Sequence, residues 1–212
     1  STITVGGGGL LALSKGESTV QSAASVSEVV IQGRTTLYSS LNSSLILNMG
    51  TPLTVSDGAE FWNNGQISYS PTSLVSVNNA FLTMVGPNGG GGNGTGAFIG
   101  SGSAINYTGA SMLSFTGGGT FTTSDFILPA TMPVPVSVSN ASVVSLNSNK
   151  TLQAVLQLSS AGKIALNNRN LTLNGLTTSG GGAFRGATLS ALTLNGVVSG
   201  GLAFESGFGS LN

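Results

Sequence analysis

The chain contains no cysteine, no histidine and very little charge. Its 212 residues include six basic and six acidic side chains, so the formal net charge is zero. Without cysteine there is no disulfide, thiolate nucleophile or cysteine-ligated metal, and without histidine the most common general base and imidazole ligand are missing. We therefore expect no metal site and no cofactor.

The scarcity of charge also restricts the partners. Charged residues make up 6% of the chain, against roughly 25% in an ordinary soluble domain. Nucleic acids and anionic membranes are bound through clustered Lys and Arg, which release counterions. No apolar run approaches the ~18 residues of a membrane span. These absences predict no nucleic-acid binding and no membrane insertion.

What the chain does contain is an internal repeat of about 21 residues, a length typical of solenoid units. Three segments that begin with Thr-Leu, at Thr151, Thr172 and Thr193, follow one another at this spacing, and Leu53 and Leu74 are separated by the same distance. Within the repeats, apolar and small polar residues alternate at period two and stop at Asn or Gly, which indicates short strands. A hydrophobic fraction of 40% supplies a core for them.

A repeat this short predicts an all-β parallel β-helix, or β-solenoid, with coils of about 21 residues and no significant helix. A βαβ crossover needs about 30 residues or more, whereas short strands joined by tight corners stack in parallel at ~4.8 Å. Asn174 and Asn195 are predicted to stack at a corner, in left-handed backbone geometry, with their amides bonded as a ladder. The predicted core contains Leu152, Leu173, Leu194, Val155, Leu176 and Val197, or their immediate alternates along the strands.

Composition divides the chain into four parts. Residues 1–16 are an N-terminal strand and a glycine hinge, and are predicted to form an assembly arm. Residues 17–128 form a first solenoid part with a Gly-rich loop at 87–96, residues 129–139 form a Pro-rich junction, and residues 140–212 carry the regular repeats. Because Pro donates no N–H, we expect the junction to interrupt the strand ladders.

The stretch from Lys163 to Asn212 resembles the repeat regions of large secreted and cell-surface β-solenoid proteins, particularly those of Bacteroidetes-type bacteria. The likeness rests on NLTLNG, a Gly/Ser/Thr stretch, a second LTLNG and a terminal SLN, and it covers about a quarter of the chain. The resemblance implies a parallel β-helix exposed outside the cell, acting in adhesion, surface layers or filaments. It implies no catalytic residues.

One acidic pair is close enough in sequence to suggest catalysis. Asp57 and Glu60 stand beside Phe61 and Trp62, which would form a sugar-stacking platform. Paired carboxylates are what carbohydrate cleavage requires. However, Asp57 is followed by Gly, a dipeptide that is typical of a turn. We therefore predict that the chain is not an enzyme.

The leading hypothesis is a structural subunit of an extracellular filament, fibre or sheath, whose partner is the chain itself as a homopolymer. Low charge removes repulsion between subunits, and solenoid ends present unpaired N–H and C=O groups. Residues 1–5 either add a strand to a neighbouring subunit or start the first coil of their own solenoid. The predicted assembly interface contains Ile3, Val5, Leu10, Leu11, Leu13 and Leu211.

The alternative is an adhesive or ligand-binding solenoid module, such as an adhesin fragment, a phage-tail fibre segment or an ice-binding protein. Ice binding favours a flat face of regularly spaced Thr, and Thr151, Thr172 and Thr193 supply one column. Surface glycans are a further expected partner. Both hypotheses place the chain outside the cell or at the cell surface. Since its first residues lack the regions of a signal peptide, we expect the mature secreted form.

Overall fold

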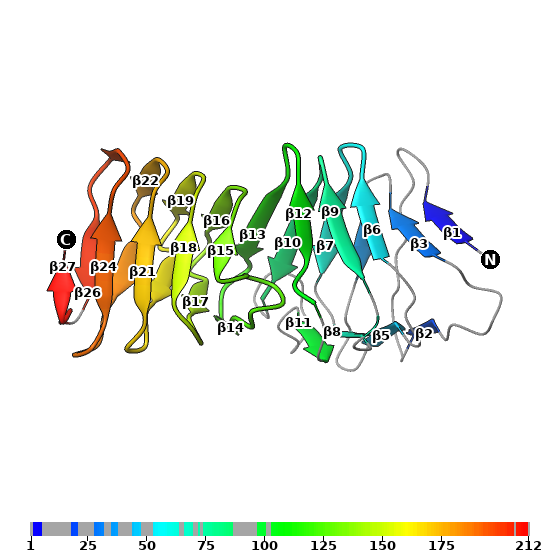
Figure 1. The fold of residues 1–212 in the computed structure, drawn as a ribbon, viewed down its shortest axis with the longest axis horizontal. Helices are drawn as coiled ribbons and strands as arrows, with labels where there is room; N and C mark the ends of the chain where they lie inside the picture. Colours follow the sequence, from blue (N-terminus) through cyan, green and yellow to red (C-terminus); the bar gives the residue numbers. More distant parts are fainter. Residues whose placement is uncertain are drawn as a thin grey trace.

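The computed structural model of the chain is a β-solenoid whose described regular structure consists of strands (Figure 1). Every pairing between these strands is parallel, which confirms the predicted fold class. The structure describes residues 2–5, 18–20, 28–31, 35–37, 44–47, 53–63, 66–69, 72, 74–86, 97–100, 103–205 and 207–211, with side chains in 53–63, 72, 74–86, 103–205 and 207–211. The Gly-rich segment 87–96 lies outside them.

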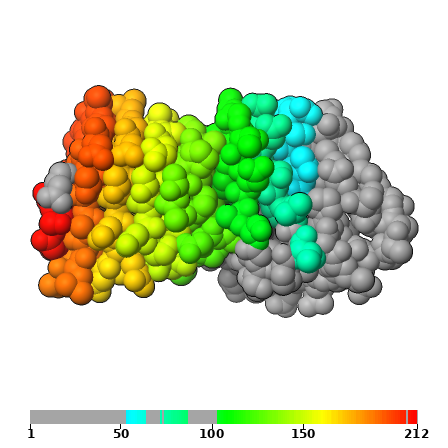
Figure 2. Space-filling view, viewed as in Figure 1, coloured from blue at the N-terminus to red at the C-terminus, as the bar shows by residue number. Residues whose placement is uncertain are grey.

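Sheet B, with eight strands, runs along most of the solenoid. Its strands are β4 (Thr35–Leu37), β7 (Glu60–Asn63), β10 (Phe81–Val85), β13 (Met112–Thr116), β16 (Val136–Val138), β19 (Leu156–Ser159), β22 (Thr177–Gly180) and β25 (Val198–Ser199). The coils follow one another as bands of colour along the long axis (Figure 2).

Two further faces are each divided between two sheets. Sheet A contains β1 (Thr2–Val5), β3 (Glu28–Ile31), β6 (Leu53–Ser56), β9 (Val75–Asn78) and β12 (Asn106–Thr108), and sheet E contains β15 (Thr131–Met132), β18 (Lys150–Leu152), β21 (Asn170–Leu173), β24 (Ala191–Leu194) and β27 (Ser210–Leu211). Sheet C contains β2 (Ser18–Val20), β5 (Ser44–Leu47), β8 (Gln66–Tyr69) and β11 (Ala97–Gly100), and sheet D contains β14 (Thr120–Thr122), β17 (Val143–Ser145), β20 (Lys163–Ala165), β23 (Ala183–Arg185) and β26 (Ala203–Glu205). In Figure 1, sheets A and E follow one another along one side of the molecule.

The coil length is regular towards the C-terminus and less regular before it. In sheet B, Leu156 pairs with Thr177 and Thr177 with Val198, so two successive coils have the same length as the sequence repeat. By contrast, Phe81 pairs with Met112, so the coil between them is distinctly longer. The regular period therefore belongs to the part of the chain in which the sequence repeat is clearest.

Sheet B passes through the Pro-rich junction without a break. Val136 pairs with Leu113 on one side and with Leu156 on the other. Pro133 and Pro135 lie between β15 and β16, and the Pro135 carbonyl accepts a hydrogen bond from the N–H of Leu113 at 3.0 Å. The expected interruption is absent from sheet B because the prolines occupy a corner. It does occur on the neighbouring face, where sheet A ends at β12 and sheet E begins at β15.

The first predicted core column is confirmed. Leu152, Leu173 and Leu194 are register partners in sheet E. The exposed fractions of Leu152 and Leu173 are 2% and 1%, and Leu194 is half-buried against the same core. Equivalent leucines of successive repeats therefore stack along the interior.

In the second predicted core column the named residues are wrong, and their immediate alternates Leu156, Thr177 and Val198 form the column instead. Val155 is half-buried, whereas Leu176 is 38% and Val197 is 71% exposed. Alternation continues from Leu152 through the corner, so the next large inward residue is Leu156, which is 1% exposed. Small residues fill the intervening inward position, because adjacent coils approach closely at this corner.

The Asn ladder is confirmed, but its backbone geometry is not. The Asn195 side-chain amide donates to Oδ1 of Asn174 at 2.9 Å, and the Asn174 amide donates to Oε1 of Gln153 at 2.8 Å. Neither Asn174 nor Asn195 is among the described residues with positive φ. Left-handed geometry occurs instead at other corners, for example at Asn167 and Asn168, whose φ angles are 53° and 61°.

The N-terminal repeat alignment is displaced by one position. Leu53 pairs with Val75 rather than with Leu74, and Leu74 is 61% exposed. The extra residue is taken up in the turn after β6, where Asp57 and Gly58 have φ angles of 58° and 77°. The N–H of Gly58 donates to the carbonyl of Asn79 in the next coil at 2.7 Å.

Candidate functional site

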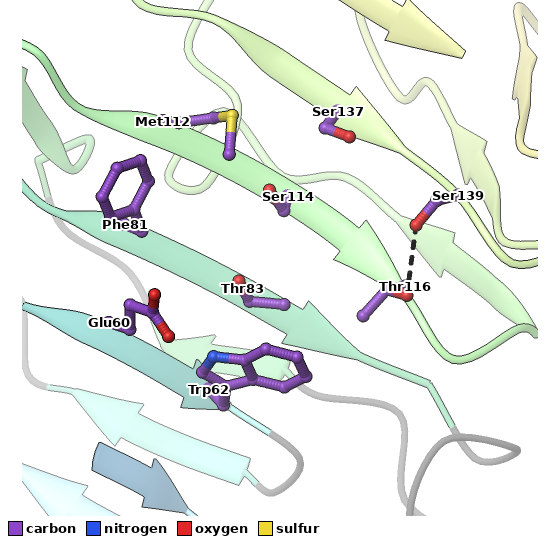
Figure 3. A pocket seen from close by; sticks show the side chains of 9 residues that line it. All are labelled: Glu60, Trp62, Phe81, Thr83, Met112, Ser114, Thr116, Ser137 and Ser139. Carbon is purple, nitrogen blue, oxygen red and sulfur yellow. Dashed lines mark hydrogen bonds between the residues drawn. The ribbon is translucent and has the colours of Figure 1, made fainter. Parts of the chain in front are cut away.

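A groove with a volume of about 320 Å³ crosses four strands of sheet B (Figure 3). At a strand spacing of about 4.8 Å, three steps from β7 to β16 extend it for about 14 Å along the solenoid. The side chains that line it, which define the outer groove, are Glu60, Trp62, Phe81, Thr83, Met112, Ser114, Thr116, Ser137 and Ser139.

The pleat of the sheet places these side chains on the outside. In β7, Phe61 and Asn63 are buried while Glu60 and Trp62 are half-buried, since alternate residues point to opposite faces. Parallel pairing then aligns the outward residues of neighbouring strands in columns. One column contains Glu60, Phe81 and Met112, and the next contains Trp62, Thr83, Ser114 and Ser137.

The outer groove is aromatic at one end and hydroxyl-rich at the other. Trp62 and Phe81 come from the neighbouring strands β7 and β10 (Figure 3). At the far end, Ser139 Oγ donates to Thr116 Oγ1 at 3.2 Å, and the Asn140 amide donates to the same oxygen at 2.8 Å. Among the nine described residues that line it, one is an acid and none is Lys or Arg.

The apolar outward side chains of sheet B belong to its earlier strands. In the later strands, the corresponding column continues from Ser137 to Gln157 and Thr178. The chain has one tryptophan, and it lines this groove. The groove is therefore a local departure from the small polar exterior of the regular repeats.

The structure places only one member of the predicted acidic pair in the outer groove. Asp57 lies in the turn after β6 and accepts a hydrogen bond from Ser56 Oγ at 3.2 Å. Glu60 lines the outer groove and Asp57 does not. The predicted aromatic platform of Phe61 and Trp62 is not formed, because Phe61 is buried at 2% exposure. Phe81 lines the groove with Trp62 instead.

Two other charged clusters are structural in character. On sheet D, Glu205 forms ion pairs with Lys163 at 2.6 Å and with Arg185 at 3.0 Å. Hydrogen bonds from these two cations lower the pKa of the Glu205 carboxyl. Within the described residues, no group of three His, Cys, Asp or Glu side chains is placed to hold a metal ion.

The second cluster joins sheet E to the segment before it. Lys150 occupies the inward column of Leu171 and Leu192, and its side chain is fully buried. Its ammonium group pairs with Asp125 at 2.6 Å and donates to the Leu128 carbonyl. Hydrogen bonds from Lys150 and Ser148 lower the pKa of the Asp125 carboxyl.

The predicted assembly residues that the structure describes belong to the first and the last described strands. Residues 2–5 form β1, which pairs in parallel with β3 of the same chain, so this segment starts the first coil of its own solenoid. Ile3 and Val5 belong to that strand, whereas Leu10, Leu11 and Leu13 lie outside the described residues. At the other end, Leu211 in β27 is 54% exposed.

The predicted threonine column is longer than the repeat alone indicates. Thr131 pairs with Thr151, which continues the column of Thr172 and Thr193 on sheet E. The Gln153–Asn174–Asn195 ladder follows two positions later on the same coils. The outer face of sheet E is thus a regular array of small hydrogen-bonding groups.

Comparison with protein-family models, with curated proteins and with solved structures gives no match for this chain. Among the described residues, no helix is long and apolar enough to cross a bilayer. Function is therefore inferred from the geometry of the chain itself.

Proposed function

We propose that this chain is a structural rod segment of an extracellular filament, fibre or sheath, built from copies of itself stacked end to end. The observation that carries the proposal is the last described coil. Its strands β25, β26 and β27 each lie at the edge of a sheet. Edge strands offer backbone N–H and C=O groups to a further strand.

The side chains of this coil support the same interpretation. Three apolar side chains of this coil continue inward columns: Val198 follows Thr177, Phe204 follows Phe184 and Leu211 follows Leu192. The earlier members are 1%, 0% and 0% exposed, whereas Val198, Phe204 and Leu211 are 40%, 44% and 54% exposed. A further coil, whether of a second copy or of the same polypeptide, would bury these apolar groups as the preceding coils bury theirs.

The opposite end has a compatible backbone. Strands β1, β4 and β2 are the edge strands of sheets A, B and C. Because all described strand pairings are parallel, a head-to-tail stack preserves strand direction from one subunit to the next. Such a heterologous contact does not close on itself and produces an open fibre.

The low charge of the chain favours association between copies. A net charge of zero over 212 residues leaves little electrostatic repulsion between copies. Strand exchange through residues 1–5 is not needed, because β1 already pairs with β3. The proposed contact therefore joins whole coils rather than a detached arm.

Electron microscopy and sedimentation velocity of the purified chain test the proposal. We expect concentration-dependent rods longer than one chain, and we expect Leu211→Glu and Phe204→Glu to abolish them, because each puts a charge in the stacked end. Leu189→Glu is the matched control, since Leu189 is 74% exposed and lies between β23 and β24. Rods of single-chain length at every concentration, or equal assembly of all three variants, would contradict end stacking.

A second candidate function is binding to a crystalline surface such as ice. It is favoured by the column of four threonines on sheet E, whose members repeat at the strand spacing of about 4.8 Å. Inhibition of ice recrystallisation by the wild type, lost in Thr172→Lys, would support it. Equal ice growth with and without the protein would exclude it.

A further inference from the structure

The irregular stretch between β14 and β15 lies at a boundary where two of the three faces change sheet. Sheet A ends at β12 and sheet E begins at β15, while sheet C ends at β11 and sheet D begins at β14. Among the described strands, only sheet B carries a ladder across this boundary, through the pairing of β13 with β16. A backbone ladder therefore joins the two parts of the rod on one face.

Residues 124–129, the bridging segment, reach back to sheet A across this boundary. The N–H of Ile105 donates to the carbonyl of Phe126 at 2.8 Å. The hydroxyl of Tyr107, in β12, donates to the carbonyl of Ile127 at 2.9 Å. Sheet A is therefore bonded to the bridging segment, rather than to a further described strand, on the side that faces the later part of the rod.

The same segment is held to the later part of the rod by a lysine. The Lys150 ammonium group pairs with Asp125 at 2.6 Å and donates to the carbonyl of Leu128. The Ser148 hydroxyl donates to the same carboxylate of Asp125. On the face of sheets A and E, these contacts connect the two parts through the bridging segment.

Apolar burial stabilises the closed bridging segment, whereas two buried polar groups oppose it. Phe126, Ile127 and Leu128 are 5%, 6% and 2% exposed and belong to the core. Against this, Ser124 Oγ is buried without a hydrogen-bond partner among the described residues, which costs free energy. The Lys150 side chain is fully buried, and a buried ammonium group must be paired to be tolerated. The closed arrangement therefore depends on the ion pair.

We propose that the bridging segment opens as a local unit, that the rod then bends about sheet B, and that the Lys150–Asp125 ion pair keeps the segment closed. The Asp125 side chain is 65% exposed, so solvent reaches the anion while the cation lies in the core. Without its anion, the ammonium group gains water only when the bridging segment moves away. Sheet B then stays paired between the two parts. The inference concerns a single chain and does not depend on end stacking.

Distances between two spin labels measure the bending. The chain has no cysteine, so Leu74→Cys and Leu189→Cys place one label on each side of the boundary, at positions that are 61% and 74% exposed. Their coils are five strand spacings apart in sheet B, from β10 to β25, which is about 24 Å. Dilution with unlabelled protein removes distances between copies. We expect one narrow distance distribution without further change, and one at least twice as wide after Asp125→Asn.

A second substitution tests whether the buried charge is the cause. Asp125→Asn combined with Lys150→Met should give the narrow distribution again, because no ammonium group is left to be hydrated. Glu205→Gln is the matched control, since it removes an ion-paired carboxylate on sheet D outside the bridging segment. A distribution that stays narrow in Asp125→Asn, that Lys150→Met fails to narrow, or that widens equally in Glu205→Gln would overturn the proposal.

Hydrogen exchange separates local opening from a general loss of stability. In the wild type, we expect the amides of Ile105 and Leu128 to exchange through an opening that depends less on urea than that of Val136, which is bonded within sheet B. Asp125→Asn should speed exchange of the first two at least tenfold and leave Val136 unchanged. The wild-type measurement is decisive where Asp125→Asn fails to fold. Exchange of all three amides with equal urea dependence, or equal acceleration of all three, would overturn local opening.

Discussion

The ammonium group of Lys150 lies 2.6 Å from the carboxylate of Asp125, although the Lys150 side chain is fully buried and that of Asp125 is 65% exposed. The lysine stands where the next two coils have Leu171 and Leu192. A buried ammonium group must be paired to be tolerated. The ion pair therefore holds the segment around Asp125 against sheet E.

The two partners of this pair should respond unequally to substitution. Asp125→Asn leaves the Lys150 charge in the core without its anion, and we expect a loss of about 1–3 kcal/mol in the free energy of unfolding. Lys150→Met removes the charge and keeps the volume, so we expect a smaller change. Urea unfolding of both variants measures the difference. A larger loss for Lys150→Met would show that Lys150 acts mainly through the Leu128 carbonyl.

The different burial of two leucines in a single repeat gives a second prediction. Leu173 is 1% exposed and Leu176 is 38% exposed. Leu173→Ala should cost about 2–5 kcal/mol, because it opens a cavity in a stacked column, whereas Leu176→Ala should change stability by about 0.5 kcal/mol or less. Thermal or urea unfolding compares the two. Similar losses in the free energy of unfolding would show that Leu176 contributes to the core as Leu173 does.

These two leucines show what the repeat reveals and what it hides. The constant repeat spacing aligns Leu152, Leu173 and Leu194 because equivalent positions of stacked coils are register partners. The repeat spacing does not indicate which residues point inward on both sides of a corner. The inward positions are Leu173, Gly175 and Thr177, and the glycine between them gives no apolar signal in the sequence.

The outer groove was only partly accessible to sequence reasoning. Glu60 and Trp62 stand out as an acid beside an aromatic, but their neighbours come from coils of unequal length: Glu60 pairs with Phe81, and Phe81 with Met112. Unequal coils leave no repeated motif from which this column could be aligned. The buried position of Lys150 was hidden for a different reason, since its partner Asp125 lies in an irregular segment.

Glycine at the sheet E corner is required by close approach between coils. A Cβ built on Gly175 would lie 2.2 Å from the carbonyl oxygen of Ala154, and one on Gly196 would lie 2.0 Å from that of Gly175. We expect Gly175→Ala to lower the free energy of unfolding by about 1–3 kcal/mol through overpacking. At Gly201 a Cβ meets nothing within 4 Å, so Gly201→Ala is the control. Equal stability of both variants would mean that the coils separate at this corner without cost.

Acid should weaken the solenoid through two carboxylates. The pKa values of Asp125 and Glu205 are lowered from their ordinary values of 3.8 and 4.5 by their Lys and Arg partners. A carboxyl whose pKa is lower in the folded state than in the unfolded state contributes stability above the unfolded pKa and loses it as the pH falls through the folded pKa. The melting temperature should therefore be steady near neutral pH and fall below about pH 4.5.

The double variant Asp125→Asn with Glu205→Gln provides the decisive comparison. It should melt at a lower temperature than the wild type at pH 7, and the difference between them should shrink as the pH falls, because the wild-type carboxyls are then protonated progressively. The six acidic residues of the chain leave few other groups to titrate in this range. Melting curves recorded from pH 7 to pH 2 at low ionic strength measure the effect, since salt screens exposed pairs. A difference in melting temperature that stays constant across this range would show that neither carboxylate is coupled to folding through its charge.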